Sequence, residues 1–236
     1  MSSRAKNKQA NRAVREQLAR EQRRRRTMIV SIAAAAVLVL AGFIGWGVYA
    51  SQKPPAAGFA VPANVTADHT GVPVSTGSTP VDIYQDFLCP VCKKFESDAG
   101  STLDDLVARK KITLVYHPIA ILDPSTTPPG YSTRAGAAAG CAADAGKFNE
   151  YLKALYAKQP AEGSAGLSND ELVQIGVGVG LTDPGFAQCV RDQKYASWMA
   201  ADTDTAASKN INSTPTVLVN GKQITNTADA LKQAVG

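Results

Sequence analysis

The sequence predicts an α/β fold, in which one sheet carries an inserted helical domain and a single transmembrane helix precedes the whole. Three observations predict it. β-rich runs lie near both ends of residues 79–236, and a long helical pattern separates them. Two cysteines, Cys89 and Cys92, stand where the first of these runs gives way to a helix. An uncharged apolar stretch, residues 28–50, lies upstream of all these elements.

The N-terminal arm, residues 1–27, is strongly basic. The first 26 residues carry a net charge of +8 and the whole chain carries +5, so the remaining residues sum to −3. A basic arm is one signature of nucleic-acid binding, but this arm ends in Arg23–Arg26 and runs directly into the apolar stretch. We therefore interpret it as a cytoplasmic arm and expect no nucleic-acid partner.

Residues 28–50 predict a single-pass anchor in the cell membrane. A helix rises about 1.5 Å per residue, so 23 residues cross a bilayer core of about 30 Å. The arginine cluster holds the N-terminus in the cytoplasm, so the residues after Ala50 face outward. The alternative is a cleaved signal peptide, because Val48–Ala50 resembles a cleavage site. With either interpretation the rest of the chain is exported.

Residues 51–78 are rich in Pro, Ala, Gly, Val and Thr and show little periodicity. This composition predicts a linker, with room for a first edge strand around residues 71–74. Residues 79–236 remain, and they are long enough for one domain with its own hydrophobic core.

The elements of this domain follow from local signals. Residues 81–88 are rich in strand formers, and Pro90 suits the first position of a helix that runs to about Arg109. A second strand is expected at 111–116, and two prolines mark a loop at 126–130. A helical insertion follows at about 131–210. The tight turn Asn220-Gly221 then joins strands expected at 216–219 and 222–225, and a helix at 228–235 ends the chain.

The spacing of Cys89 and Cys92 allows a metal site, a structural bridge or reversible thiol chemistry. A structural zinc site needs four ligands, often two cysteine pairs, but Cys141 and Cys189 are 48 residues apart and no histidine lies at a matching spacing. We therefore expect no metal and no other cofactor. A bridge across so small a loop restricts the unfolded chain little, which leaves reversible thiol chemistry as the interpretation.

Helix N-termini present unpaired N–H groups and a positive dipole end, which favour a thiolate at Cys89 and lower its pKa. We expect this thiol to be exposed at the helix end. Cys92 follows one turn later on the same face, where it can attack a mixed disulfide at Cys89. Thr214-Pro215 precedes the third strand, as a strand-start proline often does. The alternative is a cis peptide packed against the cysteines, presenting the Thr214 backbone to a substrate chain.

The order of elements resembles the thioredoxin fold in its DsbA-like thiol–disulfide oxidoreductase form. That order is a strand, Cys-Pro-x-Cys, a helix, a helical insertion, and then Thr-Pro before a hairpin. The resemblance covers residues 71–236 and implies Cys89 as the attacking cysteine, Cys92 as the resolving cysteine and Pro215 as a cis-proline. The sequence departs from many relatives at Val91, which often is aromatic or His, and at Ile83, which often is Glu. Membrane-anchored actinobacterial members are similar, and imply a reoxidising membrane partner resembling vitamin K epoxide reductase.

Cys141 and Cys189 both fall in helical patterns. In an exported domain with an even number of cysteines, a structural disulfide between them is the default, and the same family resemblance implies it. The alternative is a second redox pair. Among other polar residues, Asp86 suits a strand-end turn or a proton relay, His117 a loop or edge position, and Asp202 a solvated helix face.

Two classes of function remain. The first is a disulfide oxidase acting on unfolded or reduced exported proteins, with a reductase or an isomerase as its close alternatives. The second is a peptide-binding chaperone module without turnover, which the presence of both active-site cysteines disfavours. An isomerase benefits from dimerisation, and because the sequence has no dedicated dimer segment we expect a monomer.

Overall fold

The computed structural model describes residues 58–236, and they form a five-stranded mixed sheet with helices on both faces. The strands are β1 (Val72–Pro73), β2 (Thr79–Gln85), β3 (Ile112–Pro118), β4 (Thr216–Val219) and β5 (Lys222–Ile224), in the order β1-β3-β2-β4-β5. β2 and β3 are parallel, and the other pairs are antiparallel. β2 is therefore the central strand, which explains why Val81 and Ile83 are buried.

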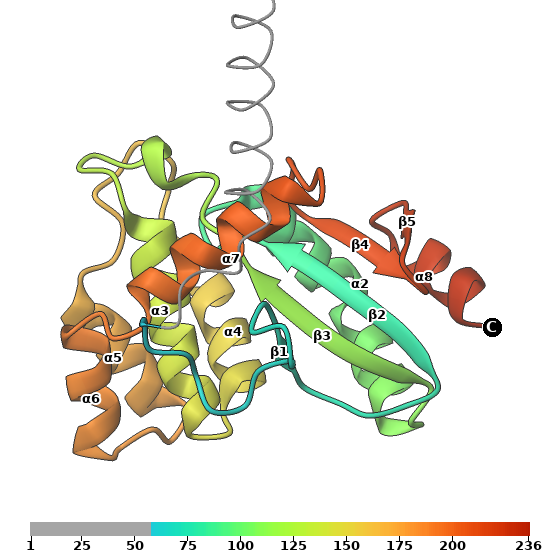
Figure 1. The fold of residues 1–236 in the computed structure, drawn as a ribbon, viewed down its shortest axis with the longest axis horizontal. Coiled ribbons are helices and arrows are strands. Elements are labelled where there is room, and N and C mark those ends of the chain that lie inside the picture. Colours follow the sequence, from blue (N-terminus) through green and yellow to red (C-terminus); the bar gives the residue numbers. More distant parts are fainter. Residues whose placement is uncertain (1–57) are drawn as a thin grey trace, which may run out of the picture. The chain divides into compact units, whose positions relative to one another are not determined.

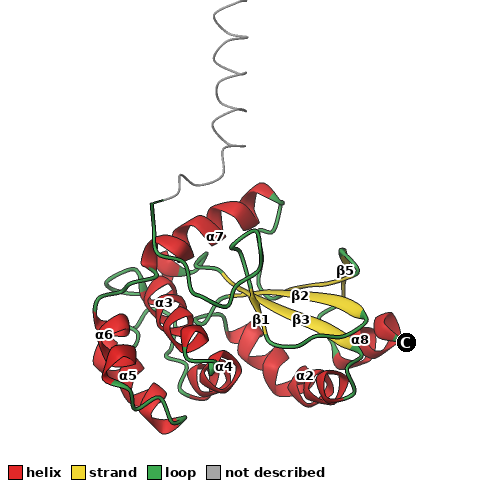
Figure 2. Cartoon of the chain, turned by 60° about the horizontal axis from the view of Figure 1, so that its bottom comes forward, coloured by secondary structure: helices red, strands yellow, loops and turns green. Residues whose placement is uncertain are grey.

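The helices form two layers and a separate block (Figure 2). They are α2 (Pro90–Ala108), α3 (Tyr131–Asp144), α4 (Phe148–Ala157), α5 (Asn169–Gly178), α6 (Pro184–Arg191), α7 (Ala196–Ser208) and α8 (Ala228–Val235). α2 and α8 cover one face of the sheet and α7 lies on the other. The helices α3 to α6 gather beside the sheet, on the left of Figure 1. This arrangement is the thioredoxin fold with a helical insertion between β3 and β4.

The insertion is held together by small residues and a disulfide. α3 is rich in alanine and glycine, and almost all of it is buried. A Cβ atom at Gly136 would overlap the side chain of Met199, so glycine lets α3 and α7 approach closely. Cys141 on α3 and Cys189 on α6 form a disulfide, with Cα atoms 6.0 Å apart.

Residues 58–70 lie against the domain, in contrast to the linker that their composition predicts, whereas the edge strand expected around residues 71–74 is present as β1. Val72 in β1 is buried, and Phe59, Val61 and Val65 pack against the core. The indole Nε1 of Trp198 donates to the His69 carbonyl oxygen at 2.6 Å. Composition alone predicted a linker because Pro, Ala and Val are also common in irregular segments that pack against a domain without regular secondary structure.

The basic arm, the anchor at 28–50 and the first residues of the linker lie outside the described residues. Within residues 58–236, no helix combines the length and the apolar character needed to cross a membrane.

Two polar residues lie deeper than their sequence context predicts. His117 belongs to β3, where its Nδ1 donates to the Thr70 carbonyl oxygen at 2.7 Å and its Nε2 lies 3.0 Å from Asp82 Oδ1. Asp202 on α7 is buried rather than solvated, and neither of its carboxyl oxygens has a hydrogen-bond partner. The partners of His117 come from distant parts of the chain, which local patterns do not reveal.

Candidate active site

The cysteine pair occupies the junction between the central strand and α2. β2 ends at Gln85, and a turn closed by the Cys89 N–H donating to the Asp86 carbonyl oxygen at 3.0 Å leads into the helix. Cys89 is the N-cap residue in an extended conformation, and Pro90 takes the first helical position, where no N–H is needed. Cys92 lies in the first turn of α2, and both thiols are free.

The Cys89 residue is less exposed than a position at a helix end suggests. It is 5% exposed and Cys92 is 1% exposed, whereas the intervening Val91 is 58% exposed. The expectation of an exposed Cys89 is therefore wrong. The cause is packing from the Thr214 loop, whose carbonyl oxygen lies 3.4 Å from the Cys89 Sγ. Pro90 and Val91 form the solvent-facing surface at this place.

The two thiols have opposite acidities. The pKa of Cys89 is lowered to about 5, chiefly by a hydrogen bond from the Cys92 thiol. Thr214 and the N–H groups of Cys92 and Val91 also lower it, whereas burial opposes the shift. Burial, together with the hydrogen bond to Cys89, raises the pKa of Cys92 far above its usual range. The helix N-terminus thus holds one thiolate and one thiol side by side.

The Thr214-Pro215 segment lies directly against the cysteine pair. Its peptide bond is cis, as one of the two sequence interpretations requires. Pro215 is buried and immediately precedes β4, and Thr216 pairs with Tyr84 at the end of β2. Thr214 is half-buried, so its backbone is partly accessible beside the Cys89 sulfur.

Asp86 is buried beneath the junction, where it organises the turn. Its Oδ1 accepts from the Leu88 N–H at 2.8 Å and from the Ser132 hydroxyl at 2.6 Å, and its Oδ2 accepts from the Leu122 N–H at 2.9 Å. Burial raises the pKa of Asp86 to about 6 against these hydrogen bonds. The turn role predicted for Asp86 is confirmed, but its hydrogen bond with Ser132 on α3 was not predictable from the sequence.

Gln159, just after α4, is a site residue that sequence reasoning missed. Its Nε2 donates to the carbonyl oxygens of Phe87 at 2.9 Å and of Cys89 at 3.0 Å. It therefore fixes the backbone on the strand side of Cys89 from 70 residues away in the sequence. A single glutamine after a helix gives no local signal of such a contact.

Cys141 and Cys189, the other two predicted site residues, lie away from the Cys89–Cys92 pair. The Cys141–Cys189 disulfide joins α3 to α6 inside the helical insertion. Within residues 58–236, no group of three or more His, Cys, Asp or Glu side chains is placed to hold a metal ion.

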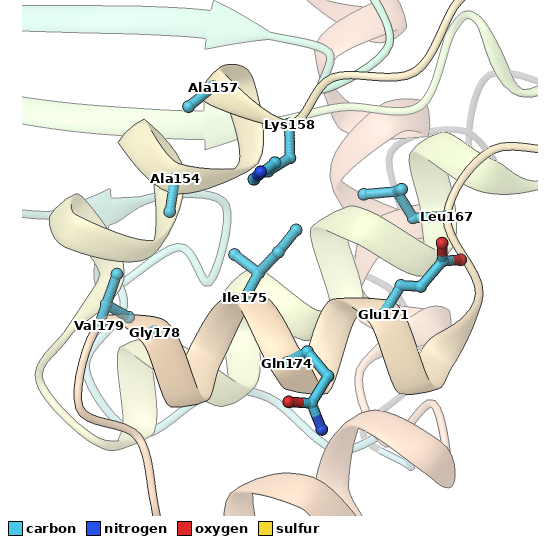
Figure 3. A pocket seen from close by; sticks show the side chains of 9 residues that line it. All are labelled: Ala154, Ala157, Lys158, Leu167, Glu171, Gln174, Ile175, Gly178 and Val179. Atoms are coloured by element: carbon cyan, nitrogen blue, oxygen red, sulfur yellow. The ribbon is translucent and has the colours of Figure 1, made fainter.

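A groove of about 420 Å³ lies between α4 and α5 (Figure 3). Its lining is largely apolar, with Lys158, Glu171 and Gln174 as its longer polar side chains. Lys158, the residue before Gln159, is one of the lining residues. The groove belongs to the helical insertion rather than to the junction that carries the cysteines.

Comparison with known proteins agrees with this geometry. Residues 74–236 match the family model described as Thioredoxin. The chain belongs to the thioredoxin family. Among solved structures, this thioredoxin-family chain is similar to the disulfide bond oxidoreductase DsbG from Mycobacterium tuberculosis. The two share 32% sequence identity with a TM-score of 0.61, over 69% of this chain and 85% of that chain.

Oxidised DsbA from Mycobacterium tuberculosis is similar too, with 33% identity and a TM-score of 0.60 over 70% of this chain and 93% of that chain. Among curated proteins, the serine/threonine-protein kinase PknE of that organism is 32% identical over 164 residues. This alignment covers 67% of the present chain, which spans only 28% of PknE. The thioredoxin-family chain is a DsbA-like thiol–disulfide oxidoreductase.

Proposed function

We propose that this oxidoreductase is an extracytoplasmic disulfide oxidase that introduces disulfides into unfolded or reduced exported proteins. Cys89 is the cysteine that reacts with the substrate, and Cys92 is the resolving cysteine. Thr214 and Pro215 form the substrate-binding backbone beside them, and the Cys141–Cys189 bridge is structural.

The observation that supports an oxidase is the stabilised Cys89 thiolate. The hydrogen bonds that lower the pKa of Cys89 exist only while the pair is reduced, because a disulfide has no thiolate to accept them. A pair whose reduced form is stabilised gives its disulfide away readily. The same stabilisation makes Cys89 a good leaving group when the mixed disulfide is resolved.

The reaction consists of two exchanges. A substrate thiolate attacks the Cys89 sulfur of the Cys89–Cys92 disulfide, which forms a mixed disulfide and releases Cys92. A second substrate thiolate then attacks the substrate sulfur of the mixed disulfide, so that Cys89 leaves as a thiolate and the substrate departs oxidised. The two electrons remain on Cys89 and Cys92 as a dithiol.

The location and partners follow from the sequence. The apolar stretch 28–50 anchors the chain with its N-terminus in the cytoplasm, and the catalytic domain acts outside as a monomer. Each turnover leaves a dithiol, so an oxidant must regenerate the disulfide. The resemblance to membrane-anchored actinobacterial members supports a membrane protein resembling vitamin K epoxide reductase in this role.

The test is the equilibrium between the full chain and glutathione, combined with two activity measurements. An oxidase equilibrates at a potential more oxidising than glutathione, refolds a reduced disulfide-containing protein and reduces insulin only weakly. A potential more reducing than glutathione with rapid insulin reduction would identify a reductase. Binding of unfolded peptide without disulfide transfer would identify a chaperone module.

A further inference from the structure

Gln159 holds the active-site backbone with one end of its side-chain amide and leaves the other end free. Its Nε2 lies 2.9 Å from the Phe87 carbonyl oxygen and 3.0 Å from the Cys89 carbonyl oxygen. Both of these partners are acceptors only, so the end of the amide that faces them must be the nitrogen. The two hydrogens of Nε2 are therefore both used, and the orientation of the amide is fixed.

The Gln159 amide oxygen, Oε1, is an acceptor that the protein leaves unused. Within residues 58–236 no group donates to it, and it is open to solvent because the half-buried Gln159 side chain does not enclose it. Oε1 and Nε2 are attached to the same carbon, so Oε1 lies within the width of one amide group of the contact with the Cys89 carbonyl. Pro90, the next residue, is exposed. An acceptor of fixed direction thus lies beside the reactive cysteine.

Gln159 and Thr214 approach Cys89 from different sides of α2. Figure 2 shows α2 between α4, which ends at Ala157, and α8, which packs against β4 and β5. Thr214 belongs to the loop that leads into β4, and its carbonyl oxygen lies 3.4 Å from the Cys89 Sγ. Gln159 reaches the Cys89 backbone from the side of α4. Hydrogen-bonding groups therefore flank the cysteine on both sides.

An acceptor in this position suits the backbone of a polypeptide. Every residue of an unfolded chain except proline carries a backbone N–H, so binding through such groups does not depend on the side chains of the chain that binds. Extended peptides often obtain their affinity from main-chain hydrogen bonds of this kind. Between Thr214 and Gln159 the surface is formed by Pro90 and Val91, which is 58% exposed, so a chain has an open path there.

We propose that the Gln159 amide oxygen is a second binding point for the substrate chain, where it accepts a backbone N–H from the part of the chain that extends away from Thr214. This inference rests on the proposed function and deepens it, because it assigns a residue to substrate binding. Two points on either side of the reacting sulfur fix the direction of the bound chain as well as its position. Gln159 therefore favours unfolded polypeptides over small thiols.

The test compares the oxidised full chain with its Gln159→Met variant in the oxidation of short, unstructured peptides with two cysteines. In a series of otherwise identical peptides, one backbone amide after another is replaced by an ester, which lacks the N–H. One ester position should lower the second-order rate constant of the wild type by about twofold to tenfold, the effect of a single hydrogen bond. The same ester should not slow Gln159→Met. Esters at positions that bind Thr214 should slow both proteins equally.

A small thiol separates substrate binding from a structural role. 2-Mercaptoethanol has no backbone N–H, so it should attack the Cys89–Cys92 disulfide of both proteins at the same rate. The Gln159→Met variant also loses the hydrogen bonds to Phe87 and Cys89. If that loss disturbs the active site, 2-mercaptoethanol and every peptide are slowed by a common factor. The ester comparison still holds, because each protein is compared with its own rate for the unmodified peptide.

The matched control is Gln174→Met, which removes a glutamine from another part of the helical insertion. Gln174 is exposed on α5 and lines the groove in Figure 3. This variant should keep the wild-type response to every ester peptide. Loss of the response in Gln174→Met, with the response retained in Gln159→Met, would place the substrate chain over the α4–α5 groove and overturn the inference.

Equal ester effects in the wild type and in Gln159→Met at every position would also overturn it, since the amide oxygen would then contribute nothing to binding. Failure of the oxidase proposal is separate, because it appears as a reducing potential in the wild type itself. In that case the same ester series, prepared as peptide disulfides and mixed with the reduced full chain, tests the binding point in the opposite direction of exchange.

Discussion

The Sγ of Cys89 lies 3.4 Å from the carbonyl oxygen of Thr214, a residue 125 positions later in the chain. The contact joins the N-terminus of α2 to the loop that precedes β4, two regions that the helical insertion separates in the sequence. A substrate backbone that binds at Thr214 therefore lies beside the sulfur that it must react with.

The two cysteines should behave differently when each is replaced alone. Cys92→Ser leaves Cys89 able to form a mixed disulfide but removes the internal thiol that resolves it. We expect this variant to accumulate a mixed disulfide with glutathione, detected as an added mass. Cys89→Ser should form little adduct, because the remaining Cys92 is buried and holds its proton tightly. The reverse pattern would exchange the two roles.

Replacing Cys92 should also change the acidity of its partner. The hydrogen bond from Cys92 is the largest influence lowering the pKa of Cys89. In Cys92→Ala this donor is absent, so the pKa of Cys89 should rise above its value of about 5. Thiolate ultraviolet absorbance followed during a pH titration measures the shift. An unchanged midpoint would show that the helix N-terminus alone sets the acidity.

The Cys141–Cys189 bridge should stabilise the fold without taking part in the chemistry. It links residues 48 apart, and in the chain-entropy model a loop of that size contributes about 4 kcal/mol. The double replacement by serine should lower the free energy of unfolding in urea by several kcal/mol. Glutathione exchange at Cys89 under native conditions should persist. Loss of exchange in a folded variant would indicate a second redox pair instead.

Local patterns predicted the order of elements and the Cys-Pro-Val-Cys junction because these depend on neighbours in the sequence. The helix beginning at Pro90 and the turn at Asn220-Gly221 are examples, and both lie where predicted. The strand predicted to reach Leu88 ends at Gln85. Phe87 and Leu88 are apolar because they are buried, although they lie in the turn rather than in the sheet.

Contacts between distant parts of the chain were not predictable. The Gln159 side chain bonds the backbone at Cys89, Asp86 bonds Ser132, and Trp198 bonds the backbone at His69. Each pair is separated by 46 residues or more. Burial by distant segments is equally hidden, since Asp202 looks solvated in the sequence and is buried in the structure.

Asp202 should make the folded protein more stable in acid than at neutral pH. Burial raises its pKa well above the usual value, with Lys209 opposing and Asp68 adding to the rise. A carboxyl group whose pKa is higher in the folded than in the unfolded state stabilises the fold at acid pH. This stabilisation is complete below the unfolded pKa of about 3.9, and it is lost as the pH rises through the folded pKa.

In Asp202→Asn that loss is absent. At neutral pH the variant should be more stable than the wild type, because the wild-type fold must either hold an extra proton or bury a charged carboxylate there. The difference should shrink toward about pH 4. Urea unfolding at several pH values measures it, and a constant difference would point to packing rather than titration.

The acidity of the Cys89 thiol is the claim on which the proposed chemistry depends. The most direct measurement is the rate of alkylation of the reduced full chain by iodoacetamide as a function of pH. The structure predicts a rise with a midpoint near pH 5, and mass analysis should place the first modification at Cys89. A midpoint at about 8.5, the value of an ordinary cysteine, or no reaction at Cys89 because of its burial, would contradict the account.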